Sequence, residues 1–212
     1  WWFGSEMEAL YGSREFLENK PFLEPMVAMS AMAAATSTIQ FAPFVLKLPV
    51  RHPVIFAKQV TSLAVLSGNR IRLGAGTSPW PDDYALVGLP WERRGRRFVE
   101  CVEILRGLGS GDYFEYHGEF YDFDAVKMNP VPTTPVPILI GGNSAALIER
   151  AARIGDGWLP ASMPRDRLRA GIDKVNALRA EYGRDHLPFD IYGPGVRSVD
   201  EVRELEELGV TH

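Results

Sequence analysis

The stretch Ile71–Ser78, which reads Ile-Arg-Leu-Gly-Ala-Gly-Thr-Ser, constrains the fold more than any other part of the sequence. Its residues are mostly apolar or small and Pro79 interrupts it, which is typical of a buried parallel strand that ends in a loop. Glycines at the end of such a strand let a ligand approach the backbone closely. Thr77 and Ser78 place two hydroxyl groups directly after them.

A second strand of the same kind covers Pro137–Ile140 and is followed by Gly141-Gly142-Asn143-Ser144 and a helix. Two strands that end at a common ligand are what the C-terminal face of a β/α barrel provides. Free N–H groups and the positive dipole end at the start of a helix attract an anion. The two glycines therefore indicate an anion site, with a simple tight turn as the alternative interpretation.

The order of the remaining elements predicts a TIM-type (β/α)8 barrel of the α/β class. Strands and helices alternate, which implies parallel strands with right-handed crossovers. The strand count falls short of eight, so we expect a barrel that lacks its first β/α unit and its last strand and helix. Strands are expected over residues 1–4, 38–46, 71–78, 137–140, 156–159 and 189–192, and one more begins at 210–211. Helices are expected over residues 25–35, 92–108, 144–154 and 165–182, and Pro53 opens one more. A loop is expected over residues 79–91 and a hairpin over 113–123.

Composition narrows the class of protein. The 212 residues are 46% hydrophobic and 24% charged, which suits one globular domain over residues 1–212. The net charge of −4 and the lack of a long basic run argue against nucleic acid as a partner. The sequence has no apolar run near the roughly 20 residues of a membrane span. Cys101 is the single cysteine and no signal peptide is visible, so we expect a cytoplasmic protein.

Several short motifs, in this order and spacing, carry a resemblance that covers nearly the whole chain. The sequence resembles the bacterial luciferase-like family of flavin- and deazaflavin-dependent oxidoreductases. The motifs are Leu-Pro-Val-Arg-His-Pro at 48–53, Lys-Gln at 58–59, Leu-Ser-Gly-Asn-Arg at 66–70, Leu-Gly-Ala-Gly at 73–76, Gly-Leu-Pro-Trp-Glu-Arg-Arg-Gly at 88–95, Gly-Glu-Phe-Tyr at 118–121, Pro-Ile-Leu-Ile-Gly-Gly at 137–142 and Gly-Asp-Gly-Trp at 155–158.

The resemblance implies a cofactor, coenzyme F420 or FMN, across the carboxyl ends of the strands. Its ring would rest on a bulge of the third strand, at Phe44-Val45, where family members often have a non-proline cis peptide. The implied contacts of the cofactor also include Thr77 and Ser78. Its phosphate would lie on the backbone of Gly141, Gly142 and Asn143, next to Ser144. Trp80 and Trp91 would wall the substrate side.

The sequence also departs from the deazaflavin-dependent sugar-phosphate dehydrogenases of this family. Their Asp-His pair at the end of the second strand is replaced by Ser5-Glu6, and their Glu in the fourth strand's loop by Pro79. That sugar-phosphate activity is therefore not expected. Glu6 is a candidate general acid or base if burial raises its pKa, and otherwise an exposed carboxylate.

These observations favour an oxidoreductase that uses coenzyme F420 or reduced FMN to transfer hydride to or from a small organic substrate. One alternative is an FMN-dependent luciferase-like monooxygenase, and another is a degenerate flavoprotein that binds a cofactor without turnover. A cofactor-free barrel lyase or isomerase lacks support, because no carboxylate pair or metal cluster follows the predicted strands. We expect a homodimer, as the resemblance implies, and no metal.

Overall fold

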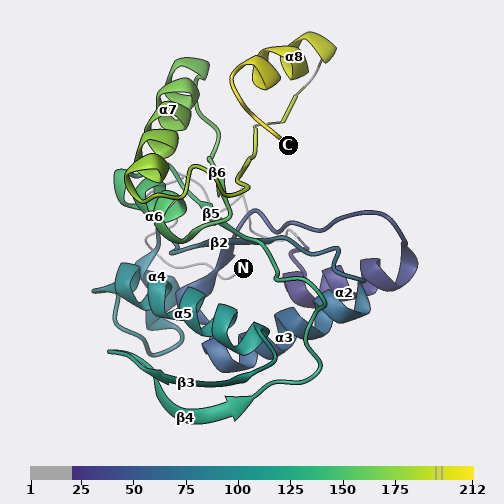
Figure 1. The fold of residues 1–212 in the computed structure, drawn as a ribbon, viewed down its shortest axis with the longest axis vertical. Coiled ribbons are helices and arrows are strands. Elements are labelled where there is room, and N and C mark those ends of the chain that lie inside the picture. The colour runs from purple at the N-terminus through teal and green to yellow at the C-terminus, as the bar shows by residue number, and fades with distance from the viewer. Residues whose placement is uncertain (1–20, 194, 197) are drawn as a thin grey trace. The chain divides into compact units, whose positions relative to one another are not determined.

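The structure is a computed structural model that describes residues 21–193, 195–196 and 198–212. Its contacts divide the described chain into two compact units, and each is treated by itself. The first unit holds residues 21–41, 47–71 and 77–136, and the second holds 42–46, 72–76 and 137–212. Figure 1 shows the elements of both units.

A parallel sheet organises the second unit. Strand β2 pairs in parallel with β5, β5 with β6, and β6 with β7. All residues of β2, β5 and β6 are buried, as expected of strands covered on both faces. The sheet has the order β1-β2-β5-β6-β7, with β1 at Leu46–Lys47, β2 at Leu73–Gly76, β5 at Ile138–Gly141, β6 at Gly157–Leu159 and β7 at Asp190–Ile191.

Helices connect these strands as crossovers. Helix α6 (Ala145–Ile154) joins β5 to β6, α7 (Arg165–Glu181) joins β6 to β7, and α8 (Val199–Glu207) follows β7. Helices α6 and α7 pack against each other, and α6 also contacts β5 and β6. Ser198 caps α8 by accepting a hydrogen bond from the N–H of Glu201.

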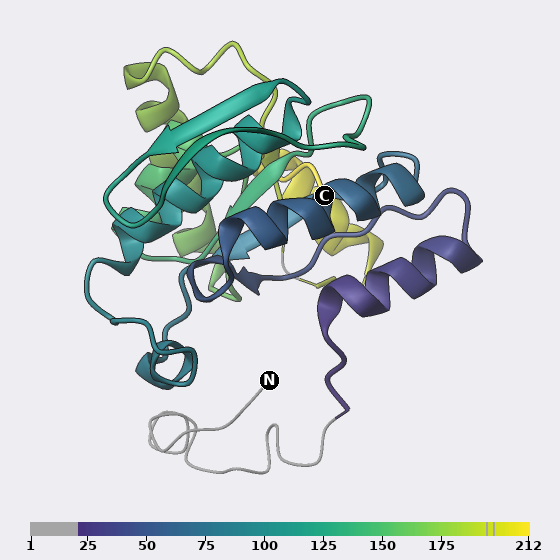
Figure 2. The same cartoon turned by 90° about the horizontal axis from the view of Figure 1, so that it is seen from below.

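The first unit is mainly helical. Helix α3 contacts both α2 and α5, and α5 also contacts strand β3; Figure 2 shows the hairpin of β3 and β4 alongside α5. The unit comprises α2 (Pro25–Ala35), the 3-10 turn η2 (Leu48–Val50), α3 (Pro53–Leu66), α4 (Pro81–Ala85), α5 (Arg94–Gly109), β3 (Tyr113–His117) and β4 (Asp122–Lys127). Its core is aromatic and aliphatic and includes Phe56, Leu63, Phe98, Ile104 and Leu108.

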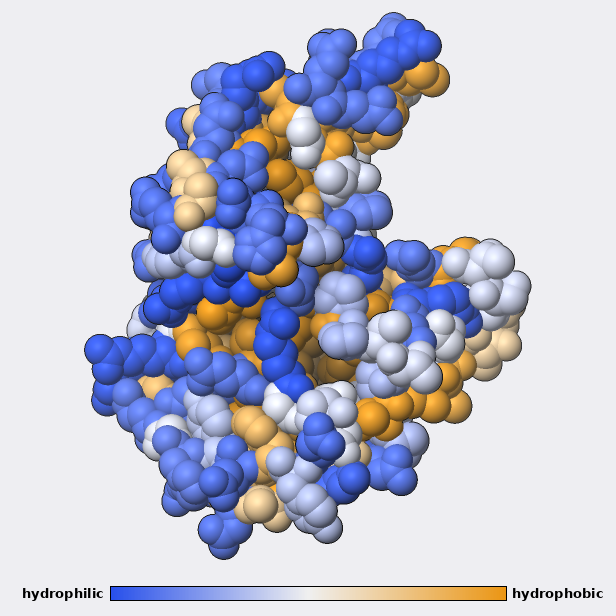
Figure 3. Space-filling model, in the orientation of Figure 1, coloured by the Kyte–Doolittle hydropathy of each residue, from blue (hydrophilic) through white to orange (hydrophobic). Residues whose placement is uncertain are grey.

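The surface over α2 and α3 carries apolar residues, which are visible in orange in Figure 3. Helix α2 contains no charged residue, and while Met26 and Met29 are buried, Val27 and Met32 are exposed. Within the described part of the chain, every helix is too short or too polar to cross a membrane.

The barrel prediction is only partly met. The α/β class and the parallel strands are confirmed, but residues 21–212, as far as they are described, form an open five-stranded sheet and no closed barrel. The strand expected at residues 1–4 lies outside the described residues. The start of a strand expected at 210–211 is not a named strand, although the N–H of Thr211 donates to the Ile191 carbonyl at 2.8 Å.

The strand expected over residues 38–46 is wrong for most of its length. Only a bridge between Phe41 and Ile71 and the short strand β1 remain of it. Pro43 lies between them and has no N–H to donate to a ladder. The peptide bond between Phe44 and Val45 is cis, as the resemblance implied.

The loop expected over residues 79–91 contains a short helix, α4, that the sequence interpretation missed. Pro81 stands at its first position and Asp82 and Asp83 in its first turn, all of which favour a helix start. The hairpin expected over 113–123 is confirmed, and it extends to Lys127.

Glycines allow residues 43–45 to lie against the strands of the second unit. A Cβ atom on Gly74 would lie 1.9 Å from the carbonyl oxygen of Pro43. Cβ atoms on Gly76 and Gly141 would lie 2.8 Å and 2.4 Å from the methyl groups of Val45. The sequence suggested that a ligand approaches the backbone beside these glycines. In the structure, residues 43–45 occupy that space.

The side chain of Glu100, in α5, holds the β3–β4 hairpin. Its carboxylate accepts hydrogen bonds from the backbone N–H groups of Glu119, Phe120 and Tyr121, at 2.8, 3.0 and 3.2 Å. Glu100 is buried, and hydrogen bonds to an ionised acceptor are the strong ones. One carboxylate therefore satisfies three successive N–H groups of the turn.

We expect Gly141→Ala to destabilise the protein by about 1–3 kcal/mol, because the new methyl group overpacks the site beside Val45. Urea unfolding measures this. Gly109→Ala is the matched control, since a Cβ there meets no atom within 4 Å. Adding Val45→Ala to Gly141→Ala should restore part of the lost stability, and a double variant less stable than Gly141→Ala would refute the proposed clash.

Glu100→Gln should cost about 2 kcal/mol or more, because an amide offers one acceptor where the carboxylate serves three N–H groups. The free energy of unfolding checks this against Glu115→Gln, a change at an exposed position of the hairpin. Equal stability of the two variants would mean that Glu100 does not anchor the turn.

Candidate cofactor site

Gly142, at the end of β5, uses both of its backbone groups within the protein. Its N–H donates to the carbonyl oxygen of Leu159 at 3.0 Å, and its carbonyl accepts the indole N–H of Trp158 at 2.9 Å. Its φ of +123° is in the region that favours glycine, and a Cβ would meet Leu147 at 2.4 Å. The Gly142 N–H is therefore already bonded within the protein, and the contact of the Gly141–Asn143 backbone with a phosphate stays a prediction.

Asn143 joins the loops that follow β5 and β6. Its side-chain oxygen accepts the N–H of Ala161 at 2.8 Å, and its side-chain nitrogen donates to the carbonyl of Ala161 at 3.3 Å. This two-point bond occupies the amide side chain. Any contact of Asn143 with a cofactor would therefore be made by its backbone.

The start of α6 is the part of this segment that can receive an anion. Ser144 caps the helix, and its hydroxyl accepts the N–H of Leu147 at 3.3 Å. The next two residues, Ala145 and Ala146, are exposed, and N–H groups in a first turn have no intrahelical acceptor. Small side chains leave these N–H groups accessible, so the donor set fits a phosphate group.

In the first unit, Ser78 is held by a buried hydrogen-bond cluster. Its hydroxyl donates to the carboxylate of Asp83 and accepts the backbone N–H of Trp80 at 3.1 Å. The φ of Ser78 is +62°, a conformation that non-glycine residues adopt rarely. The carbonyl of Thr77 accepts the hydroxyl of Tyr84. The Ser78 hydroxyl is therefore engaged within the protein.

A buried ion pair belongs to the same cluster. The ammonium of Lys47 lies 2.6 Å from Asp83, whose side chain is 1% exposed. The same ammonium lies 4.7 Å from the centre of the Trp80 ring, a cation–π contact. Burial lowers the pKa of Lys47, while the hydrogen bond that its ammonium donates to Asp83 acts in the opposite direction. This pair was not predicted from the sequence; its signals were a single lysine within an apolar segment and two adjacent aspartates.

The two tryptophans expected to wall the substrate side differ. Trp80 is 5% exposed and packs on Lys47, and its role as a substrate wall stays a prediction. Trp91 is partly exposed and lies edge-on to Tyr84, with ring centres 5.3 Å apart. The guanidinium of Arg94 covers the Trp91 ring at 3.5 Å.

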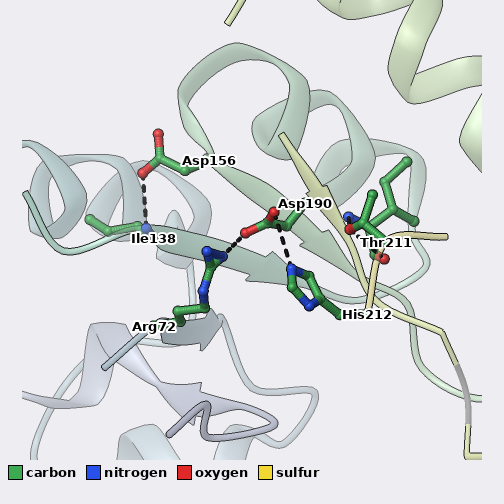
Figure 4. Close-up of polar contacts among 7 residues, drawn as sticks. Arg72, Ile138, Asp156, Asp190, Thr211 and His212 are labelled. Carbon is green, nitrogen blue, oxygen red and sulfur yellow. Dashed lines mark hydrogen bonds and ion pairs between the residues drawn. The ribbon is translucent and has the colours of Figure 1, made fainter. Parts of the chain in front are cut away.

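The amino ends of the sheet strands carry a separate polar network, shown in Figure 4. Asp190 pairs with Arg72 and lies 3.4 Å from the imidazole of His212. Asp156 accepts the N–H of Ile138 at 2.9 Å. Groups at this end of parallel strands generally contribute to stability, whereas sites lie at the carboxyl ends. No group of three acidic, histidine or cysteine side chains suited to a metal occurs among the described residues.

The remaining predicted residues are placed as follows. Phe44 is exposed and Val45 half-buried, both in the second unit with Gly141–Ser144. The first unit contains Thr77, Ser78, Trp80 and Trp91. Glu6 lies outside the described residues.

Comparison with known proteins identifies relatives along nearly the whole chain. The family model for luciferase-like monooxygenases matches residues 7–207. An uncharacterised protein of Mycobacterium tuberculosis is 51% identical over 202 residues, covering 94% of this chain and 69% of that protein. An FMNH2-dependent dimethylsulfone monooxygenase of Pseudomonas fluorescens is 30% identical over 190 residues, covering 88% of this chain and 50% of that protein.

A solved structure has the same fold. The coenzyme F420-dependent tetrahydromethanopterin reductase from Methanopyrus kandleri superposes with a TM-score of 0.71 at 20% identity. The match covers 80% of this chain and 53% of the reductase. With the family match and the 51% identical relative, these findings confirm the resemblance: the chain belongs to the luciferase-like monooxygenase family.

Proposed function

We propose that this chain is an oxidoreductase that uses coenzyme F420 or reduced FMN to transfer hydride to or from a small organic substrate. The observation that carries the proposal is the exposed start of α6, with small side chains and first-turn N–H groups directly after β5. Relatives described as FMNH2-dependent and F420-dependent support the cofactor class. The bound ring would supply the redox chemistry, and the protein would bind, orient and exclude water.

Cofactor contacts are proposed for each of the two units by itself. The anionic end of the cofactor is assigned to the backbone of Asn143–Ala146, and Ser144 holds the helix start in place. The ring is assigned to Phe44-Val45, where Phe44 is 58% exposed. Thr77 and Ser78 remain proposed neighbours of the cofactor, and Trp91 a proposed substrate contact. Glu6 remains the proposed general acid or base.

Two alternatives stay testable in the same assay. An FMN-dependent monooxygenase is favoured by the 30% identity to the dimethylsulfone monooxygenase. A flavoprotein without turnover is favoured by Ser5-Glu6 in place of the Asp-His pair. The protein would be cytoplasmic and a homodimer under each of these proposals.

Titration with coenzyme F420 and with FMN, followed by quenching of cofactor fluorescence, should show saturable binding of one of them. The cofactor that binds decides between deazaflavin and flavin chemistry. Consumption of the reduced cofactor on addition of candidate substrates then separates an enzyme from a binding protein. Binding of neither cofactor would refute the proposal.

Ala146→Asp should weaken binding of that cofactor at least about tenfold, or about 1.4 kcal/mol, because it places a carboxylate at the proposed phosphate position. The same carboxylate in a first helical turn favours the helix, so misfolding is not expected. The dissociation constant from the quenching titration is the measurement.

Ala146→Asn is the matched control, since it has the same shape without the charge. It should retain most of the affinity. Equal losses in both variants would show a steric effect, and no loss in either would place the phosphate elsewhere.

A further inference from the structure

The indole of Trp158, in β6, is hydrogen-bonded to the segment that follows β5. Its Nε1–H donates to the carbonyl oxygen of Gly142 at 2.9 Å, and the N–H of the same glycine donates to the carbonyl oxygen of Leu159 at 3.0 Å. Both residues that bind Gly142 belong to β6, which pairs in parallel with β5. Strand β6 therefore holds both backbone polar groups of Gly142, one through its own backbone and one through a side chain.

Packing holds this indole in one orientation. The side chain of Trp158 is fully buried. A Cβ atom on Gly171, in α7, would lie 2.4 Å from the indole ring, so the ring occupies the space beside that glycine. A buried N–H that lacks an acceptor loses the hydrogen bond that it would otherwise make with water. Close packing and the need for an acceptor thus both favour the bond to Gly142.

The position of Gly142 determines where α6 begins. Gly142 precedes Ser144, the N-cap of α6, by two residues. Its φ is +123°, and a Cβ atom on it would lie 2.4 Å from the side chain of Leu147 in the first turn. Only glycine combines this backbone conformation with so close a contact. A shift of the Gly142 peptide would therefore also shift the first-turn N–H groups of α6.

A second connection between the same segments is weaker. The side chain of Asn143 bonds to the backbone of Ala161 at 2.8 and 3.3 Å, but Asn143 is exposed and water competes for its groups. The bond from Trp158 comes from a donor that water does not reach. Of the two connections, the indole is thus the one that orders this segment before any ligand binds.

We propose that Trp158 is a positioning residue for the anion site at the start of α6: its indole N–H holds the Gly142 peptide so that the N–H groups of Ala145 and Ala146 face the phosphate of the cofactor. This inference rests on the proposed function and adds a buried residue that touches neither cofactor nor substrate. Donors that are already ordered lose less conformational entropy when they bind an anion.

Trp158→Phe tests the inference, because it keeps a buried aromatic ring and removes the N–H. The quenching titration gives two dissociation constants, one for the cofactor that the unmodified protein binds and one for its counterpart without the phosphate, which is riboflavin for FMN. We expect affinity for the phosphorylated ligand to fall at least about fivefold, and affinity for its counterpart by less than about twofold. The ring is common to both ligands, so the ratio of the constants isolates the phosphate.

Tyr182→Phe is the matched control in the same unit. It also keeps a ring and removes a donor, here the hydroxyl that bonds to Glu149 at an exposed position. It should change neither constant.

A second replacement guards against misfolding. Site-specific exchange of Trp158 for 3-benzothienylalanine keeps the shape of the indole and puts sulfur in place of the N–H, so this protein should fold. It should show the same selective loss for the phosphorylated ligand. An equal loss for both ligands, or an unchanged ratio, would overturn this inference while leaving the proposed function intact. Failure of the unmodified protein to bind either cofactor would overturn both.

Discussion

The close approach of residues 43–45 to three glycines is the constraint on which the strand ends of the second unit depend. Gly74, Gly76 and Gly141 stand where any Cβ would meet Pro43 or Val45 within 1.9–2.8 Å. The segment therefore lies on the sheet only because these strands carry no side chains there. Close packing makes such a contact unforgiving, since an interior filled to crystal density has little room for one more methyl group.

Hydrogen bonds within the protein determine which backbone donors after β5 remain available to a ligand. Gly142 bonds to Leu159 and Trp158, and the Asn143 side chain bonds to Ala161. These bonds connect the segments that follow β5 and β6. The N–H groups of Ala145 and Ala146, at the start of α6, have no intrahelical acceptor. Internal bonds thus connect the two loops and leave the helix start as the accessible donor set.

In the first unit, two buried carboxylates each bind more than one hydrogen-bond donor. Asp83 binds Lys47 and Ser78, and Glu100 binds three N–H groups of the hairpin turn. Both carboxylates are buried, and each is stabilised by several donors, as a buried charge requires. The two acids tie loops to helices α4 and α5, respectively.

Local features of the sequence determined most of the elements. Apolar runs predicted β2, β5 and β6, and Pro53 located the start of α3, because both signals act within a few residues. The motif order identified the family. The candidate site was predicted only to the level of segments: strand ends, the start of α6 and the Phe44-Val45 position.

Only the tertiary structure decided how these segments are used. It placed Val45 against Gly76 and Gly141, engaged the N–H of Gly142, buried Trp80 and joined Lys47 to Asp83, 36 residues apart. Such contacts depend on which residues folding brings together, and periodicity over a few positions carries no record of that. The sequence shows which polar groups each segment contains, whereas packing decides which of them form hydrogen bonds within the protein.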